Sequence, residues 1–347
     1  MDTTENRTRY SRQMLFAPIG PAGQRKLSEA RVAIVGAGAL GTVLANHMVR
    51  AGVGFVRIVD RDFVEESNLQ RQMLYDEDDA RGHMPKAIAA AEKLRRVNSG
   101  VAIEPVVGDL HAYNAEALLG DVDVILDGTD NFQVRFLIND VAVKRRIPWI
   151  YGGAVSSRGM FATIRPFETP CYRCLFPHPP SGRGETCDTV GVIGPIIHIV
   201  ASYQATEALK LLVGAEPDRL NPYLEQFELW SNRHVQMDIR QGRHPECPAC
   251  GRGTFEFLEP EDDGEDAYST LCGRDSVQIM PRGGRTVDFD EEEAVLGKLG
   301  AVERTPFLLR FHIDGFTMVL FPDGRVLVQG TSDIAVAKTL YAKYIGH

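Results

Sequence analysis

The sequence predicts an α/β protein in which a mostly parallel sheet carries helices on both faces, followed by a small C-terminal α+β domain. Short β-branched runs alternate with helical patterns between residues 31 and 151, as in parallel sheets. A glycine-rich turn joins the first run to the first helix. The length of 347 residues is enough for two domains.

The elements of the parallel part follow in order along the chain. Residues 1–30 are expected to form an N-terminal arm that contains a helix. Strands are expected at 31–35, 53–60, 101–107, 122–126 and 148–151, and helices at 39–50, 85–97 and 131–146. Pro85 begins its helix at the position where a missing N–H costs least.

The pattern changes after Gly152, where longer, antiparallel strands at 159–165 and 223–240 flank an apolar helix at 194–213. The main domain is expected to cover 31–255, with an acidic linker at 256–269. The C-terminal domain, 270–347, shows a hairpin signal at Asp314-Gly315, and residues 331–333 can cap a last helix.

Composition narrows the class of protein. Hydrophobic residues make up 44% and charged residues 24%, as in ordinary globular enzymes. The net charge of −9 argues against a nucleic-acid partner, because such proteins present a basic face. The N-terminus lacks the apolar core of a secretory signal, and polar residues interrupt the apolar stretch 190–213. We therefore expect a cytoplasmic protein with no membrane or nucleic-acid partner.

Residues 36–41, GAGALG, fit the G-x-G-x-x-G pattern between a strand and a helix. Gly36, Gly38 and Gly41 permit a tight turn and a close approach of phosphates to the helix N-terminus. Asp60 ends the next strand, 19 residues after Gly41, where a carboxylate can accept hydrogen bonds from ribose hydroxyls. These residues predict a Rossmann-like nucleotide site. It is not a P-loop, because Thr42 stands where that motif requires lysine.

The segment after Asp60 favours a triphosphate over a dinucleotide. It concentrates amide and guanidinium groups, which are donors to phosphate oxygens: Asn68, Gln70, Arg71 and Gln72. Lys86 adds a second cation. Asp130 follows a strand at its carboxyl end and is a candidate Mg²⁺ ligand; the alternative is that it caps the following helix.

Four of the six cysteines form two Cys-x-x-Cys pairs, which consist of Cys171, Cys174, Cys247 and Cys250. In a long chain without an export signal this usage indicates metal binding in a reducing compartment. Four thiolates make a closed tetrahedral Zn²⁺ site, which is structural because no coordination position stays open.

Taken together, the segments RYSRQ, GAGALG, VDRDFVEESNLQRQ, DGTDN, PCYRC, TCDTVGV and CPAC resemble the ThiF/MoeB/HesA family, relatives of ubiquitin-activating enzymes. The resemblance covers residues 7–251. It implies ATP-dependent adenylation of the C-terminal carboxylate of a ubiquitin-like sulfur-carrier protein that ends in Gly-Gly. The carrier would serve thiamine synthesis, which we prefer, or molybdenum-cofactor synthesis. It also implies a homodimer.

Carried over by motif, the resemblance assigns ribose binding to Asp60, phosphate contacts to Asn68, Arg71 and Lys86, and Mg²⁺ to Asp130. The rest of the implied nucleotide site comprises Gly36, Gly38, Ala39, Gly41 and Asn131. Ala39 replaces the third glycine of the usual family loop, which is a small change. Arg12 would reach the nucleotide site of the partner subunit. Cys187 would either form a covalent intermediate with the carrier or be a dispensable thiol.

Two other functions stay open from the sequence. The first is an NAD-dependent oxidoreductase, which the glycine loop and Asp60 favour but the Arg71 cluster and the cysteine pairs do not. The second is a non-catalytic scaffold with a degraded nucleotide site, against which the intact Asp60, Arg71, Lys86 and Asp130 argue.

Overall fold

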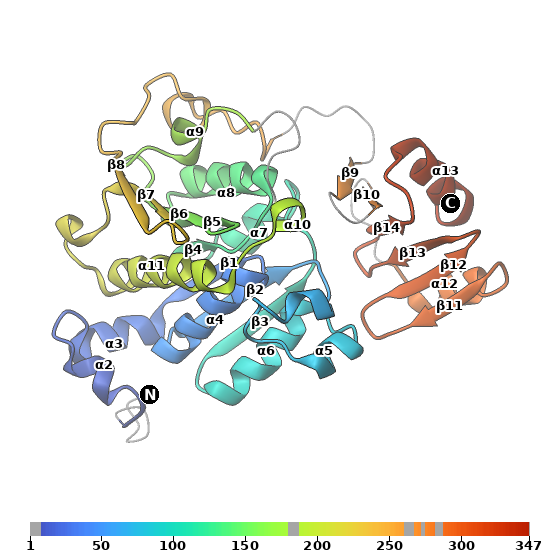
Figure 1. Ribbon diagram of the computed structural model, residues 1–347, viewed down its shortest axis with the longest axis horizontal. Coiled ribbons are helices and arrows are strands. Elements are labelled where there is room, and N and C mark those ends of the chain that lie inside the picture. The colour runs from blue at the N-terminus through green and yellow to red at the C-terminus, as the bar shows by residue number, and fades with distance from the viewer. Residues whose placement is uncertain (1–7, 180–186, 260–266, 272–274, 282–286, 347) are drawn as a thin grey trace. The chain divides into compact units, whose positions relative to one another are not determined.

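The computed structural model describes residues 8–179, 187–259, 267–271, 275–281 and 287–346, with the backbone alone at 187–188, 267 and 269–271 (Figure 1). The chain divides into two compact units, Met1–Glu261 and Asp262–His347. The predicted acidic linker, 256–269, lies partly outside the described residues.

The first unit is built on an eight-stranded sheet in the order β3-β2-β1-β4-β5-β6-β7-β8. The first five strands of this order are parallel, and β6, β7 and β8 continue the sheet in antiparallel pairs. The strands are β1 (Arg31–Val35), β2 (Phe55–Asp60), β3 (Ala102–Val107), β4 (Val124–Asp127), β5 (Trp149–Val155), β6 (Arg158–Ile164), β7 (Tyr223–Glu228) and β8 (Arg233–Asp238).

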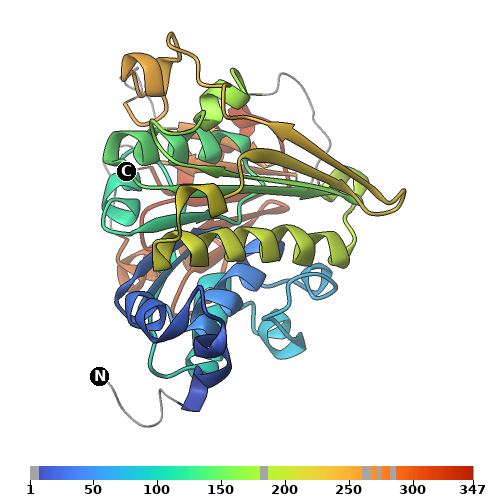
Figure 2. The same ribbon diagram turned by 90° about the vertical axis from the view of Figure 1, so that its left-hand side faces the viewer.

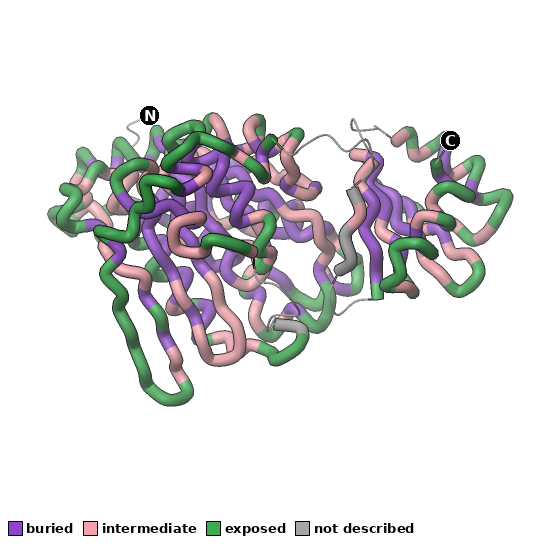
Figure 3. The backbone as a smooth tube through the Cα atoms, turned by 90° about the horizontal axis from the view of Figure 1, so that it is seen from above, coloured by how far each residue is buried: buried purple, intermediate pink, exposed green. Residues whose placement is uncertain are grey.

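Helices cover both faces of this sheet, so the predicted fold class is confirmed. Strand β1 sends Val32 and Ile34 into one core and Ala33 and Val35 into the other, because side chains alternate along a strand. Buried residues, purple in Figure 3, follow the strands. The first core takes α3 (Gly20–Glu29), α4 (Ala39–Ala51), α6 (Lys86–Val97) and α11 (Gly194–Val213); the second takes α7 (Ala115–Leu119) and α8 (Phe132–Arg145).

Helix α11 is the long apolar helix predicted at 194–213. By length and composition it is long and apolar enough to cross a membrane. In the structure it packs against β5, β6 and α4 and runs along the sheet, as Figure 2 shows. These contacts identify it as a core helix, as the sequence predicted.

Shorter elements join these layers. They are α2 (Ser11–Leu15), η1 (Glu66–Asn68), α5 (Glu77–Arg81), α9 (Tyr172–Leu175), α10 (Cys187–Val190), η2 (Pro217–Arg219) and η3 (Pro248–Arg252). The region predicted as strand at 223–240 is the hairpin of β7 and β8, in which β8 is an exposed edge strand.

The second unit is a six-stranded antiparallel sheet in the order β11-β12-β13-β14-β10-β9. Its elements are β9 (Ala267–Leu271), β10 (Ser276–Met280), α12 (Phe289–Leu296), β11 (Ala301–Arg304), β12 (Leu309–Ile313), β13 (Phe316–Leu320), β14 (Val326–Gln329) and α13 (Ile334–Tyr344). Asp314 and Gly315 both have positive φ in the predicted hairpin turn, and Asp333 caps α13. Cys272 lies outside the described residues.

Two predicted helix starts are off by one residue. Helix α8 begins at Phe132, because the Oδ1 atom of Asn131 accepts the N–H groups of Gln133 at 2.9 Å and Val134 at 3.3 Å. Helix α6 begins at Lys86, and Pro85 precedes it as the N-cap residue rather than as the first helical residue.

Candidate functional site

The strand order reverses between β1 and β4, which makes their carboxyl ends the expected ligand crevice of an open α/β sheet. The glycine loop follows β1, and the loop that contains Asp130 follows β4. The two loops pack backbone on backbone: a Cβ at Gly36 would lie 2.7 Å from the carbonyl oxygen of Gly128. A Cβ at Gly41 would lie 1.8 Å from the carbonyl oxygen of Gly36. Glycine is therefore required at these positions by packing as well as by phosphate access.

Asp60 holds the glycine loop in place. Its Oδ2 atom accepts the N–H of Ala37 at 2.6 Å, and its Oδ1 atom accepts the N–H of Asp62 at 2.7 Å. Burial raises the pKa of Asp60, and the nearby ammonium of Lys86 opposes that rise. The carboxylate thus stands at the carboxyl end of β2, beside the loop that the ribose of a nucleotide would approach.

Lys86 lies beside Asp60 although the two residues are far apart in the chain. Its ammonium is 3.3 Å from Oδ2 of Asp62, and its side chain is 5% exposed. The hydroxyl of Tyr75 lies 2.7 Å from the carbonyl oxygen of Ala37 and 3.1 Å from that of Lys86. Tyr75 therefore ties the start of α6 to the glycine loop.

The amide and guanidinium cluster forms a compact turn around η1. Asn68 is buried, and its Oδ1 atom accepts the N–H of Glu65 at 3.1 Å, so its side chain stabilises the turn itself. Gln72 is buried with its amide beside Gly38, and its Oε1 atom has no hydrogen-bond partner among the described residues. Arg71 donates from Nη1 to the carbonyl oxygen of Ser67 at 2.8 Å. Among the described residues, Gln72 thus keeps one buried acceptor without a partner close to the glycine loop.

Asp130 is exposed at the carboxyl end of β4. The alternative role considered for it, capping α8, belongs to Asn131 instead. The side-chain oxygen of Asn131 is therefore occupied by helix capping, and its Nδ2 group is the side-chain donor that remains.

A buried ion pair that the sequence analysis did not single out supports the loop after β4. Nε of Arg135 donates to Oδ2 of Asp127 at 2.9 Å, and both side chains are buried. Nη2 of Arg135 also donates to the carbonyl oxygens of Thr129 at 2.6 Å and Gly152 at 3.0 Å. Burial favours a lower pKa for Arg135, but the carboxylate of Asp127 outweighs it and raises the pKa. The available sequence signal was an arginine between the apolar residues Val134 and Phe136.

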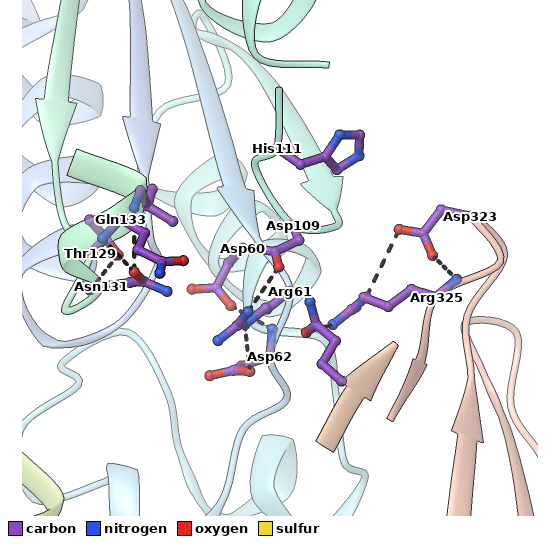
Figure 4. A network of polar contacts seen from close by, with 12 residues as sticks. Asp60, Arg61, Asp62, Asp109, His111, Thr129, Asn131, Gln133, Asp323 and Arg325 are labelled. Carbon is purple, nitrogen blue, oxygen red and sulfur yellow. Dashed lines mark hydrogen bonds and ion pairs between the residues drawn. The ribbon is translucent and has the colours of Figure 1, made fainter. Parts of the chain in front are cut away.

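Arg61 is a second site residue that the sequence analysis did not single out. Its side chain lies between Asp62 and Asp109 (Figure 4), with Nη1 2.8 Å from Oδ2 of Asp109. Burial tends to lower the pKa of Arg61, but the carboxylates of Asp109 and Asp62 outweigh it and raise the pKa. The position directly after the predicted ribose acid was the signal that could have identified it.

The four paired cysteines converge at one point of the second core, although the pairs are far apart in the chain. Their Sγ atoms all lie within 4.8 Å of one another, and they carry free thiols. The Cys171–Cys174, Cys171–Cys247 and Cys174–Cys250 sulfur distances are 3.8, 3.6 and 3.5 Å. Four Zn–S bonds of about 2.3 Å in a tetrahedron require sulfur separations of about 3.8 Å. The cluster therefore fits a tetrahedral metal ion.

Residues 10–249 match the ThiF family. The chain belongs to the ThiF family. The predicted family is thus confirmed, over a region that includes the glycine loop, the Arg71 turn and three of the four clustered cysteines, and that ends one residue before Cys250.

Two curated proteins illustrate the relationship. The chain is 48% identical over 339 residues to the sulfur carrier protein ThiS adenylyltransferase of Bacillus subtilis, covering 97% of this chain and 99% of that protein. It is 38% identical over 277 residues to the sulfur carrier protein adenylyltransferase of Thermus thermophilus, covering 78% of this chain and 98% of that protein. Both names describe adenylyltransferases and not oxidoreductases.

Among solved structures, the fold resembles E. coli MccB, crystallised with MccA-N7isoASN. The TM-score is 0.62 at 24% identity, over 70% of this chain and 75% of that chain. This similarity supports the fold that places the ThiF-family motifs.

Two further residues were implied by the family resemblance. Arg12 is exposed on α2 in the N-terminal arm. The backbone of Cys187 begins α10, but its side chain lies outside the described residues.

Proposed function

We propose that this ThiF-family chain uses ATP to adenylate the C-terminal glycine carboxylate of a ubiquitin-like, ThiS-like sulfur carrier in thiamine biosynthesis. The observation that carries the proposal is the near full-length match to a ThiS adenylyltransferase at 48% identity. The switch-point crevice supports it, because Asp60 accepts a hydrogen bond from the glycine loop, Tyr75 ties the backbone of Lys86 to that loop, and such a loop suits phosphates.

The reaction is a single group transfer. A carboxylate oxygen of the carrier attacks the α-phosphorus of ATP, a P–O bond forms, and the bond to the β,γ-pyrophosphate breaks. The products are the acyl adenylate and pyrophosphate. The carboxylate is already ionised at neutral pH, so no general base is needed. The difficulty is the repulsion between two anions, which positioned cations reduce.

Within this proposal each site residue has one role. Asp60 accepts hydrogen bonds from the ribose, and the backbone of Gly36, Gly38, Ala39 and Gly41 approaches the phosphates. Asn68, Arg71 and Lys86 contact phosphate oxygens, and Asn131 donates to the nucleotide. Arg61, fixed by Asp109 beside Asp60, belongs to the wall of the same crevice.

Two metal ions complete the proposal. Asp130 would hold Mg²⁺, which prefers one or two carboxylates together with phosphate oxygens; the exposed carboxylate beside the crevice fits this preference. Bound Mg²⁺ would neutralise part of the triphosphate charge. Cys171, Cys174, Cys247 and Cys250 would hold a structural Zn²⁺, and the N–H of His244, 3.5 Å from Sγ of Cys174, would stabilise the thiolate.

The proposal extends to the assembly and the cell. The chain acts as a cytoplasmic homodimer in which Arg12 of each subunit serves the partner's site. Two observations support this role. Arg12 belongs to the family motif RYSRQ, and it is exposed on the N-terminal arm.

Cys187 has two alternative roles, and a substitution distinguishes them. If Cys187 carries the activated carrier, Cys187→Ser retains pyrophosphate exchange but loses sulfur transfer. If its thiol is dispensable, the variant retains both activities.

The test of the function is ATP–pyrophosphate exchange with two purified carriers, one thiamine-type and one molybdopterin-type, each ending in Gly-Gly. We expect exchange that depends on the thiamine-type carrier. Exchange with the molybdopterin-type carrier alone would reassign the pathway. No exchange with either carrier at saturating Mg²⁺-ATP would refute the function, and a nicotinamide absorption band in the purified protein would favour the oxidoreductase.

A further inference from the structure

Lys86 occupies a position that is unfavourable for a cation. It is the first residue of α6, a helix of 12 residues, and the N-terminus of a helix carries a positive partial charge. The side chain is also only 5% exposed, so water cannot stabilise the ammonium as it does at a surface. A charged group in such a place requires a partner supplied by the fold.

The fold supplies Asp62 through the backbone. The N–H of Lys86 donates to the carbonyl oxygen of Asp62 at 2.9 Å, and the N–H of Val64 donates to that of Met84 at 2.9 Å. Phe63 and Pro85 form an antiparallel bridge between these bonds. The 3.3 Å contact between the ammonium and the Asp62 carboxylate is therefore set by main-chain pairing as well as by the two side chains.

The other charged groups of this region make hydrogen bonds and ion pairs of their own. The carboxylate of Asp60 accepts two backbone N–H groups, and Asp109 pairs with Arg61. The side chain of Asp62 also faces Arg61, whose Nε lies 3.8 Å from Oδ1. Asp62 thus presents one oxygen to each of two cations, and the closer cation is Lys86.

We propose that Asp62 is a positioning residue for the adenylation step. This inference rests on the proposed function of Lys86. In the absence of nucleotide its carboxylate holds the ammonium in place near Asp60, which hydrogen-bonds the glycine loop. When ATP binds, the phosphates take over the contact, and Asp62 remains behind the ammonium. Asp62 acts through Lys86 and need not touch the substrate.

Removing the carboxylate of Asp62 distinguishes an effect on the position of the Lys86 ammonium from an effect on ATP binding. In Asp62→Asn the triphosphate meets one negative charge fewer, so ATP binding is retained. The ammonium loses the group that holds it, so the transition state loses a charge-assisted hydrogen bond. We expect kcat for carrier-dependent pyrophosphate exchange to fall about 10-fold to 100-fold. The KM for ATP should change less than about threefold, because the lost contact acts in the transition state.

The test compares Asp62→Asn, Asp62→Glu, Lys86→Met and the double variant Asp62→Asn/Lys86→Met. Asp62→Glu should recover part of kcat. In the Lys86→Met background, Asp62→Asn should have little further effect on kcat, because the cation through which it acts is gone and Asp109 still holds Arg61. The double variant removes the ammonium together with the carboxylate that faces it, so it remains informative even if Asp62→Asn folds poorly. Glu77→Gln, on the exposed face of α5, is the charge-matched control with unchanged kcat.

The outcomes distinguish two failures. A wild-type protein without carrier-dependent exchange would overturn the proposed function and this inference with it. With an active wild type, a folded Asp62→Asn variant at full kcat would overturn the role of Asp62 alone. A loss that persists undiminished in the Lys86→Met background would show that Asp62 does not act through Lys86.

Discussion

At the scale of single residues, Arg71 has more N–H donors than it uses within the η1 turn. It donates one hydrogen bond within the η1 turn and forms no ion pair among the described residues. A guanidinium has five N–H donors, so several remain for phosphate oxygens. Arg71→Ala should lower carrier-dependent pyrophosphate exchange about 10-fold to 150-fold, the scale of one charged hydrogen bond.

The fold should tolerate that substitution, because the half-buried side chain contributes one hydrogen bond, at an exposed position, to the turn. Circular dichroism and the thermal midpoint of Arg71→Ala should match the wild type. Arg81→Ala is the matched control: its ion pairs with Glu77 and Asp78 are exposed, and such pairs contribute little. Undiminished exchange in Arg71→Ala would exclude a phosphate role.

The residue types indicated which polar groups the site contains better than they indicated which contacts those groups make. Asn68 and Asn131 were both expected at the nucleotide, yet the Oδ1 atom of each satisfies a backbone N–H of its own turn. Short amide side chains are favoured at such caps, so a motif alone cannot separate a cap from a ligand contact. Their roles at the nucleotide remain proposals.

At the scale of elements, α8 anchors the last segment of the first unit through Asp140. The Oδ2 atom of Asp140 accepts the N–H of Phe257 at 2.9 Å, and burial raises the pKa of Asp140 to about 6. The folded state therefore binds more protons than the unfolded state between about pH 4 and pH 6. The contribution of this group to the free energy of unfolding is complete below that window and is lost as the pH rises through it.

Asp140→Asn keeps an acceptor for Phe257 and removes the titration. Relative to wild type, the variant should gain free energy of unfolding as the pH rises from 4 to 7, by up to about 3 kcal/mol. Urea unfolding at both pH values measures this difference. A constant difference across the range would contradict the raised pKa.

The cysteine cluster joins α9 to η3, two short elements that lack a large core of their own. We expect one zinc ion per chain in the purified protein. Chelation or Cys250→Ser should remove the zinc ion and lower the free energy of unfolding. The thermal midpoint should fall by about 2–4 °C for each kcal/mol of that free energy. Cys272→Ser, outside the two pairs, should keep its zinc. Purified wild-type protein without zinc would contradict the assignment.

At the scale of the whole molecule, the proposed exchange of Arg12 between subunits makes a prediction about mixed dimers. Arg12→Ala and Arg71→Ala should each be weakly active alone. After the subunits are mixed, a heterodimer contains one site with Arg71 from one chain and Arg12 from the other, and that site is intact. Pyrophosphate exchange should therefore rise well above the sum of the two variants.

The control mixes each variant with itself under the same conditions, which should leave its activity unchanged. Failure of the mixture to recover activity, with subunit exchange verified by tagged chains, would place Arg12 outside the partner's site. A monomeric mass in solution would exclude the arrangement altogether.

Local features of the chain were predictable because they depend on neighbouring residues. Short β-branched runs located the parallel strands of the sheet, a long apolar stretch located helix α11, and the Asp314-Gly315 pair located a hairpin turn. The elements that the sequence analysis left unassigned, such as α12 and β11, are short and carry weak periodicity. Their formation depends on packing in the second unit.

The amino-acid pattern was sufficient for the fold class, the glycine loop and the metal-binding character of the cysteines, since each is a property of one short segment. The approach of Asp62 to Lys86, the support of Asp127 by Arg135, and the convergence of the two cysteine pairs came from the folded chain. Asp62 reaches Lys86 through the main-chain bridge of Phe63 with Pro85, and the cysteine pairs meet although they are far apart in the chain. No local periodicity records such contacts, because they form only when the whole sheet buries both of its faces.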